Sequence, residues 1–390
     1  MTGVHTMRTL VVTNDFPPRR GGIESFVRAL ADRLGDVVVY TASMPGSEEV
    51  DAALPYPVIR DRSGTLLPTP RVRDAVVTAL REHRCDRVLI GSSVPLGLLA
   101  PALRKAGAEV IVAMTHAHEV WWSRLPGTRQ ALRKVGDGVD WLTDISDWTR
   151  REIGTALSDA GRARQTRMAP GVDTDHFRPG CGGAAVRASL GLTQEVPVVV
   201  CAARLVERKG QDMLIEAWPR VLREVPDARL VIVGDGPYRA KLEKLAVQRG
   251  VCDVVTFAGS VPWEQMPGYM DAADVFAMPS RSRLMGLEPE GLGIVFLAEG
   301  LGIVFLEAAA CEKPVVVGRS GGAPEATDDG VTGHVVDPTD PAEIARRVVE
   351  LLTDREGAAE MGRLGRERVL TSWQWEQVGA TCRRLLGLEG

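Results

Sequence analysis

The 390-residue sequence has no run of about 18 uncharged apolar residues, so no segment is expected to span a membrane. Its N-terminus lacks the basic region, apolar core and cleavage site of a secretion signal, which argues against export. The six cysteines are scattered and form no C-x-x-C pair, which gives no sign of a zinc or disulfide framework and fits a reducing compartment. We therefore expect a cytoplasmic protein, with attachment to the inner face of the plasma membrane left open.

Hydrophobic residues make up 45% and charged residues 25% of the chain, which is typical of a folded globular protein. The length favours two domains. The net charge of -4 is unevenly distributed, because residues 1–180 carry +3 and the remainder carries -7. Either two domains with different partners or chance accounts for this asymmetry.

Apolar runs alternate with helical patterns in both halves of the chain, which predicts two doubly wound α/β domains with parallel sheets. A Pro/Gly-rich stretch at 169–183 reads as the linker between them. The carboxyl ends of both sheets, where ligands bind in such folds, are expected to face a common cleft. The expected strands are 7–13, 37–41, 87–90, 110–114, 141–144, 196–202, 229–233, 254–257, 275–278, 314–317 and 333–335. The expected helices are 23–34, 72–83, 95–106, 211–224, 237–248, 262–272, 305–311 and 341–352.

The motif ARLVERKG follows a buried strand and opens a helix. It places two cations, Arg204 and Lys209, five residues apart at the mouth of a parallel sheet. A diphosphate bound there would meet both cations and the free N–H groups at the start of the helix. The alternative is a pair of solvated surface cations.

Glycine-rich turns follow several other strands. The GDGP turn, with Gly234, Gly236 and Pro237, allows the backbone to approach a ligand, and Pro237 is expected to start the next helix. An ordinary tight turn explains this motif equally well. The sequence SGGAPE at 320–325 is a similar turn, and Gly21 and Gly22 open the first helix.

A nine-residue tandem repeat lies near residue 300. EGLGIVFLA at 290–298 is followed by EGLGIVFLE, in which Glu299 and Glu307 stand eight apart. Only the second copy keeps both carboxylates, which suit vicinal hydroxyls, so we expect it to form the site, with Glu307 two turns into a helix. The first copy is expected to be a bulged loop. A cloning or recording slip is the competing explanation, and it predicts an intact mass lower by nine residues.

The sequence THAHEV follows another strand of the first half. The H-x-H-E pattern of His116, His118 and Glu119 has no further ligand at metal-binding spacing, and no H-E-x-x-H occurs in the sequence. We therefore expect no metal site, and we expect His118 to hydrogen-bond a hydroxyl at a strand end.

Together, PPRRGG, THAHEV, ARLVERKG, VGDGP, the E-x7-E stretch and SGGAPE make the chain resemble family 4 retaining glycosyltransferases of GT-B fold, over nearly its whole length. VTNDFPPRRGGIESF and the C-terminal SWQWE resemble the actinobacterial GDP-mannose-dependent phosphatidylinositol mannoside α-mannosyltransferases. The relatives typically have glycine where Ala117 stands. The resemblance implies an acceptor domain at 1–178, completed by a returning helix at 375–390, and a donor domain at 179–374.

The resemblance also implies residue roles. Arg204 and Lys209 would hold the diphosphate, Glu299 the mannose and Glu307 the ribose. The implied catalytic residues are His118, Arg204, Lys209 and Glu299. The implied donor-binding residues are Gly21, Gly22, Arg204, Lys209, Gly234, Gly236, Pro237, Glu299, Gly300, Leu301, Gly302, Ile303, Val304 and Glu307. The implied acceptor-binding residues are Asp15, Arg19, His118 and Arg124.

The predicted reaction transfers α-mannose from GDP-mannose to a phosphatidylinositol mannoside-type lipid, with retention and without a metal or other cofactor. A basic stretch with Trp121, Trp122 and Leu125 supports contact with an anionic membrane, and a solvated helix face is the alternative. Three other interpretations are another nucleotide sugar with a soluble acceptor, a nucleotide-sugar 2-epimerase, and a non-catalytic sensor. We expect a monomer or weak dimer that binds no nucleic acid.

Overall fold

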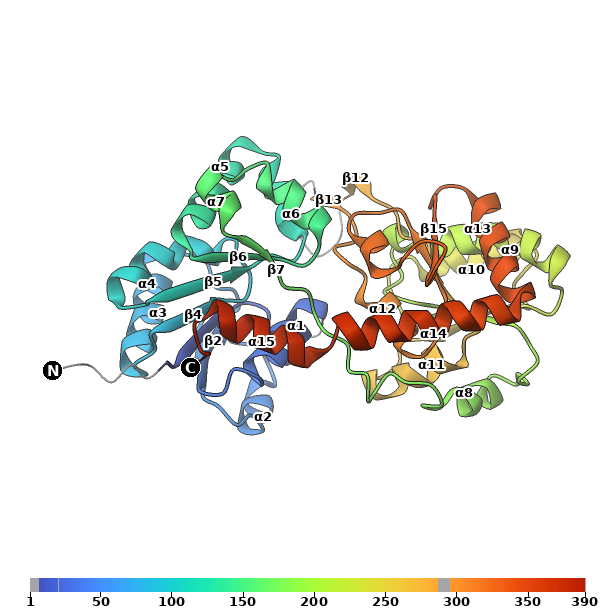
Figure 1. Cartoon of the computed structure of the whole chain (residues 1–390), viewed down its shortest axis with the longest axis horizontal. Coiled ribbons are helices and arrows are strands. Elements are labelled where there is room, and N and C mark those ends of the chain that lie inside the picture. Colours follow the sequence, from blue (N-terminus) through green and yellow to red (C-terminus); the bar gives the residue numbers. More distant parts are fainter. Residues whose placement is uncertain (1–6, 20, 287–294, 390) are drawn as a thin grey trace. The chain divides into compact units, whose positions relative to one another are not determined.

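The computed structural model describes residues 7–19, 21–286 and 295–389. The chain divides into two compact units, one made of Met1–Pro170 with Trp375–Gly390 and the other of Gly171–Gln374 (Figure 1). The structural division follows Pro170, eight residues before the boundary that the resemblance implies. No helix among the described residues is long and apolar enough to cross a membrane.

The first unit is built on a seven-stranded parallel sheet with the order β3-β2-β1-β4-β5-β6-β7. Its central strands are buried along their whole length, as expected for a sheet covered on both faces. The strands are β1 (Thr9–Thr13), β2 (Val37–Ala42), β3 (Val58–Asp61), β4 (Arg87–Ile90), β5 (Val110–Met114), β6 (Trp141–Asp144) and β7 (Gln165–Arg167). The helices are α1 (Gly22–Ala31), α2 (Ser47–Ala52), α3 (Pro70–Glu82), α4 (Ala100–Ala106), α5 (Pro126–Gly138), α6 (Asp147–Gly154), α7 (Asp159–Ala163) and α15 (Trp375–Leu385).

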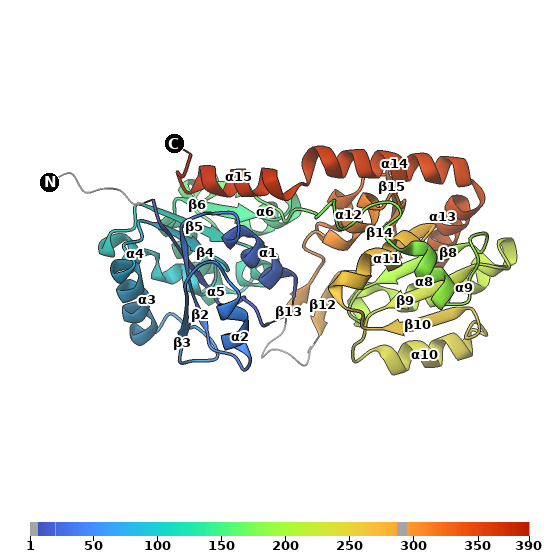
Figure 2. The ribbon, with the colours of Figure 1, turned by 90° about the horizontal axis from the view of Figure 1, so that it is seen from below.

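The second unit has a six-stranded parallel sheet with the order β10-β9-β8-β11-β14-β15 and a separate two-stranded ribbon (Figure 2). The sheet strands are β8 (Val198–Ala202), β9 (Arg229–Val233), β10 (Val255–Gly259), β11 (Val275–Met278), β14 (Val315–Gly318) and β15 (Gly333–Val336). The helices are α8 (Gly183–Ser189), α9 (Gln211–Glu224), α10 (Arg239–Gln248), α11 (Met266–Ala272), α12 (Ile303–Ala310), α13 (Pro341–Thr353) and α14 (Arg355–Ser372). The described residues of the two units also form the 3₁₀ turns η1 (Leu96–Leu99), η2 (His118–Ser123), η3 (Glu207–Lys209), η4 (Trp263–Gln265) and η5 (Ala323–Ala326).

Two doubly wound α/β folds were predicted, and this fold class is confirmed. The long helix α14 was not predicted, because glycines lower its helical propensity. Its glycines instead allow close packing: a Cβ on Gly362 would lie 2.0 Å from the carbonyl oxygen of Glu312. In Figure 1, α14 runs beside α12, which it contacts.

The first repeat copy differs from the expected bulged loop. Its residues Val295–Leu297 form β13, which pairs antiparallel with β12 (Arg283–Gly286) in the ribbon. Residues 290–294 lie outside the described part of the chain. The sequence did not predict this ribbon, because the three apolar residues of β13 show no alternation of polarity and fit a strand or a loop equally well.

Candidate active site

The loop after β8 presents the predicted cations. Arg204 is exposed, and Lys209 ends the 3₁₀ turn η3, which leads through Gly210 into α9. Gly210 is in the left-handed region at φ 76°, and a Cβ there would lie 2.0 Å from the Pro279 carbonyl oxygen. Only glycine fits, so the loop presses against the segment that follows β11.

The central contact of the site is an ion pair between Lys209 and Glu299. Lys209 Nζ lies 2.6 Å from Glu299 Oε2, and the side chains are only 14% and 12% exposed. A guanidinium nitrogen of Arg208 lies 3.6 Å from the same oxygen. Burial alone would raise the pKa of Glu299, but the charges of Lys209 and Arg208 hold this pKa below its ordinary value. Glu299 is therefore an ionised acceptor of hydrogen bonds.

Arg281, in the segment that follows β11, holds the turn that carries Lys209. The backbone N–H of Arg281 donates to the Arg208 carbonyl at 2.8 Å, and its guanidinium makes two bonds to Asp212 at 2.7 and 3.0 Å. These bonds anchor η3 to the first turn of α9. The ion pair between Arg281 and Asp212 thus helps to hold the turn in which Lys209 lies.

The SGGAPE turn holds the backbone of Glu299. The N–H of Gly322 donates to the Glu299 carbonyl at 2.8 Å, and the hydroxyl of Ser320 accepts from the Glu299 N–H at 3.4 Å. Gly321 has φ 57°, and a Cβ there would lie 2.1 Å from the Glu299 carbonyl oxygen. The glycines of this turn therefore let it close over Glu299.

Helix α12 begins at Ile303, four residues after Glu299, and its first turn offers free N–H groups. Gly302 is its N-cap at φ 78°, and Ile303 and Val304 form the first turn, whose N–H groups have no intrahelical partner. Leu301 is buried, so it can offer a ligand only its backbone. A Cβ added at Gly302 would lie 3.5 Å from Glu299 Cγ, so the start of this helix lies beside the Glu299 side chain.

Glu307 is the second carboxylate of the repeat. It lies just over one turn into α12, rather than the two turns expected from sequence. Burial raises its pKa to about 7. A desolvated carboxylate of this kind is a strong acceptor for a hydroxyl pair once it is ionised.

The GDGP turn packs against the loop that carries the predicted cations. Gly234 and Gly236 lie against the backbone of the cation loop, because a Cβ would meet the Ala203 carbonyl at 2.1 Å or the Leu205 carbonyl at 2.4 Å. These glycines position that loop through backbone packing. Pro237 does not start the helix, since α10 begins at Arg239.

The first unit carries its own predicted cluster. Asp15 and Arg19 form an ion pair at 3.6 Å in the loop after β1. At the start of α1, a Cβ on Gly21 would lie 2.4 Å from the carboxylate of the buried Glu24. Negative charge therefore already lies at the helix N-terminus beside Gly21 and Gly22, where an anionic ligand was expected.

His118 begins η2, with Nε2 3.3 Å from the Ser92 hydroxyl and 3.4 Å from the buried carboxylate of Glu119. Desolvation lowers the pKa of His118, and the charge of Asp15 opposes this shift. The imidazole is therefore neutral at pH 7 and can donate or accept a hydrogen bond. Ala117 before it has φ 74°, a left-handed conformation that favours glycine.

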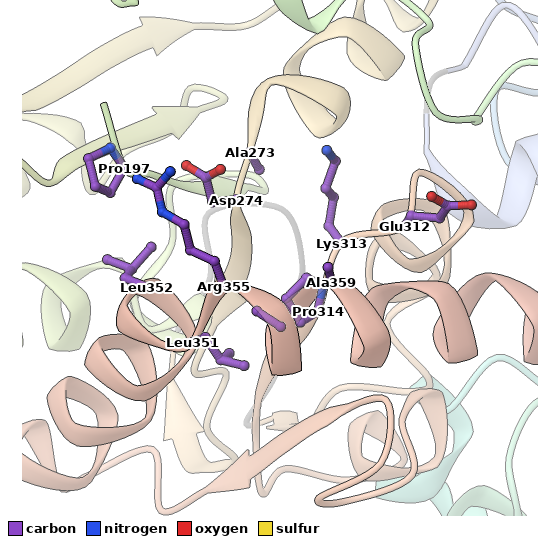
Figure 3. Close-up of a pocket in the computed structure, with 11 residues that line it drawn as sticks. Pro197, Ala273, Asp274, Glu312, Lys313, Pro314, Leu351, Leu352, Arg355 and Ala359 are labelled. Atoms are coloured by element: carbon purple, nitrogen blue, oxygen red, sulfur yellow. The ribbon is translucent and has the colours of Figure 1, made fainter. Parts of the chain in front are cut away.

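Arg124, which was predicted to bind the acceptor, follows η2 and is exposed. Its guanidinium pairs with Glu152 at 2.9 Å on the exposed side of η2. A cavity of about 180 Å³ in the second unit is also unrelated to the predicted site (Figure 3). It is lined by Pro197, Asp274 and Pro314, which immediately precede β8, β11 and β14, so it lies at the amino ends of the strands.

The comparisons with known proteins fit this geometry. The profile described as "Glycosyl transferases group 1" matches residues 184–368, and that described as "Glycosyltransferase Family 4" matches residues 21–176. The chain belongs to the family 4 glycosyltransferases. This glycosyltransferase is similar in fold to Anabaena HepE in complex with UDP and glucose, with a TM-score of 0.79 and 19% identity over 98% of this chain and 100% of that one.

Two curated relatives match this glycosyltransferase over nearly its whole length. A GDP-mannose-dependent alpha-(1-6)-phosphatidylinositol monomannoside mannosyltransferase of Mycolicibacterium smegmatis is 46% identical, covering 97% of both chains. A GDP-mannose-dependent monoacylated alpha-(1-6)-phosphatidylinositol monomannoside mannosyltransferase of Corynebacterium glutamicum is 43% identical, covering 98% of both. The predicted family and GT-B fold are confirmed.

Sequence reasoning missed Arg208, Arg281 and the support from Ser320. Arg208 stands next to Lys209 in the motif, so a signal was present. Arg281 gave none, because its role depends on folding that brings it beside Asp212, 69 residues away.

We predict that Glu307→Gln stabilises the ligand-free enzyme in alkaline solution. The folded-state pKa of about 7 lies above the ordinary value of 4.5, so the folded state keeps a proton that the unfolded state has lost. The free energy of unfolding therefore falls as pH rises through this window. The variant should be more stable than the wild type by roughly 1–3 kcal/mol near pH 8 and equal to it near pH 4, as measured by urea unfolding.

The exposed Glu224 of the same unit provides the control, since Glu224→Gln should leave the pH profile unchanged. A Glu307→Gln profile parallel to that of the wild type would contradict the desolvation of Glu307.

Proposed function

We propose that this glycosyltransferase moves α-mannose from GDP-mannose to a phosphatidylinositol mannoside-type lipid. One observation carries the proposal: the two mannosyltransferase relatives are 43–46% identical to this chain across both units. The donor-side motifs lie at the carboxyl ends of β8 and β14, where nucleotide ligands bind in such sheets.

In the proposed donor complex, Lys209 and Arg204 neutralise the diphosphate, with Arg208 adding charge nearby. Charge grows on the diphosphate as the bond from mannose C1 to the leaving oxygen breaks, so these cations stabilise the transition state more than the bound substrate. We propose that these positive charges stabilise the leaving diphosphate without a bound metal ion. Lys209 needs no large movement, because it is already fixed by Glu299.

We propose that Glu299 and the N–H groups of residues 300–304 hold the mannose, and that Glu307 accepts the ribose hydroxyls. Glu299 is ionised and its side chain lies beside Gly302, so sugar hydroxyls can donate to it while the free N–H groups donate to sugar or phosphate oxygens. The leaving phosphate then takes the proton of the acceptor hydroxyl on the same face of the sugar, which retains the α configuration.

On the acceptor side, neutral His118 hydrogen-bonds a hydroxyl, and Asp15 and Arg19 bind polar groups of the acceptor. His118 is fixed by Ser92 and by the buried Glu119. Arg124 is the weakest of the proposed acceptor residues, because Glu152 already neutralises its charge. The expected cleft between the units remains a prediction.

Substitution of the cations tests the donor assignment. Lys209→Ala or Arg204→Ala should lower GDP release from GDP-mannose with lipid acceptor at least a hundredfold, roughly the loss of one strong electrostatic contact in a transition state. Lys244→Ala, on the exposed side of α10, is the matched control and should retain full activity. Thermal unfolding of each variant verifies folding, and near-normal turnover of both site variants would overturn the assignment.

Membrane contact is a separate proposal, centred on η2 and α5. Trp121 and Trp122 are partly exposed with ring centroids 5.2 Å apart, and Leu125 is 50% exposed. The apolar face of α5 packs into the unit, so its exposed face presents charge, mainly from Arg133 and Lys134. We propose that these cations meet anionic headgroups while the two tryptophans and Leu125 enter the interface.

Vesicle flotation tests this contact. The protein should float with vesicles rich in anionic phospholipid, and the double variant Arg133→Gln/Lys134→Gln should float less. Lys244→Gln/Arg346→Gln removes the same charge from the exposed surface of the second unit and should not change flotation. Absence of binding to anionic vesicles would contradict the membrane proposal and favour a soluble acceptor.

A further inference from the structure

Two cysteines far apart in sequence lie side by side in the second unit. Cys181 Sγ is 4.0 Å from Cys311 Sγ, across 130 residues of sequence. Cys181 lies in the segment that leads into α8, and Cys311 is the C-cap of α12. The donor-side mechanism uses neither thiol.

The position of Cys181 is fixed by its neighbours. The N–H groups of Gly180, Gly182 and Gly183 donate to the Asp271 carboxylate at 3.0, 3.2 and 2.7 Å. Cys181 Sγ itself lies 3.3 Å from the Pro267 carbonyl oxygen, and both acceptors belong to α11. The segment is therefore held against α11, with the two sulfur atoms 4.0 Å apart.

The two thiols differ in access and acidity. Cys181 is half-buried, whereas Cys311 is fully buried. The hydrogen bond from the Cys311 thiol lowers the pKa of Cys181 to about 6, although burial and Asp271 oppose it. The same contact raises the pKa of Cys311, as do burial and Asp271, while Lys313 acts in the opposite direction. Access and acidity therefore both favour Cys181 over Cys311 as the attacking thiolate.

We propose that Cys181 and Cys311 are a redox modification site that closes to an intramolecular disulfide when the enzyme meets a low-molecular-weight organic disulfide. The Cys181 thiolate attacks one sulfur of the oxidant, forming a mixed disulfide and releasing one thiolate. Cys311 then loses its proton and attacks Cys181 Sγ, and the second half of the oxidant leaves as a thiol. Two protein thiols are oxidised and one disulfide is reduced to two thiols.

The closed disulfide would join the start of the second unit to the end of α12. This helix carries the proposed donor-side N–H groups at its other end, and the carbonyl of Glu307, one turn before Cys311, accepts from the Cys311 N–H. Oxidation would thus restrain the helix that presents the donor site, without contacting the donor itself.

Peptide mapping tests the site. The native protein is treated with oxidised glutathione, remaining thiols are alkylated after denaturation, and disulfide-linked peptides are identified by mass spectrometry. The wild type should give a Cys181–Cys311 linked peptide. Cys311→Ser should stop at a Cys181–glutathione mixed disulfide, and Cys181→Ser should leave Cys311 a free thiol because it is buried.

The exposed Cys252 is the internal reference and the matched control. Cys252→Ser should cross-link as the wild type does. The proposal is overturned if Cys181 stays a thiol or a mixed disulfide in the wild type while Cys252 is fully modified. A linked peptide that pairs Cys181 with any other cysteine also overturns it.

Discussion

The ion pair between Lys209 and Glu299 is the contact on which the donor side depends. It joins two loops that are 90 residues apart, one after β8 and one before α12. Neither residue is well solvated, so each charge needs the other to offset the cost of burial. Because Glu299 is already ionised and oriented, the donor complex that we propose would need little reorganisation of this pair during the reaction.

The surrounding backbone is shaped to allow this pair. Gly210 and Gly321 adopt left-handed conformations at carbonyl contacts that no side chain would tolerate, one on each partner's side. Gly234 and Gly236 likewise leave room for the carbonyl oxygens of Ala203 and Leu205 in the cation loop. Glu307 shows the cost of this arrangement, since its desolvation makes the ionised form unfavourable in the folded protein. Burial of Glu307 thus lowers the free energy of unfolding at a pH where this carboxylate is ionised.

Much of the fold was predictable because the buried strands are continuous apolar runs bounded by turn residues. The two strands of the seven-stranded sheet that were missed, β3 and β7, are short and lie at its edges, where partial exposure weakens the pattern. The site motifs could be identified in the sequence from their residue types and their order along the chain. Their contacts were not: the pairing of Lys209 with Glu299, the support from Arg281 and the packing role of Gly234 all depend on segments brought together by folding. The roles assigned to individual site residues remain predictions.

The central claim is that this chain transfers mannose with retention to a mannosylated phosphoinositide lipid. Incubation with GDP-mannose and phosphatidylinositol monomannoside, followed by mass spectrometry and NMR of the lipid, tests it directly. We expect one added mannose in α linkage for each GDP released. Release of free mannose without a lipid product, or a β-linked product, would contradict the account.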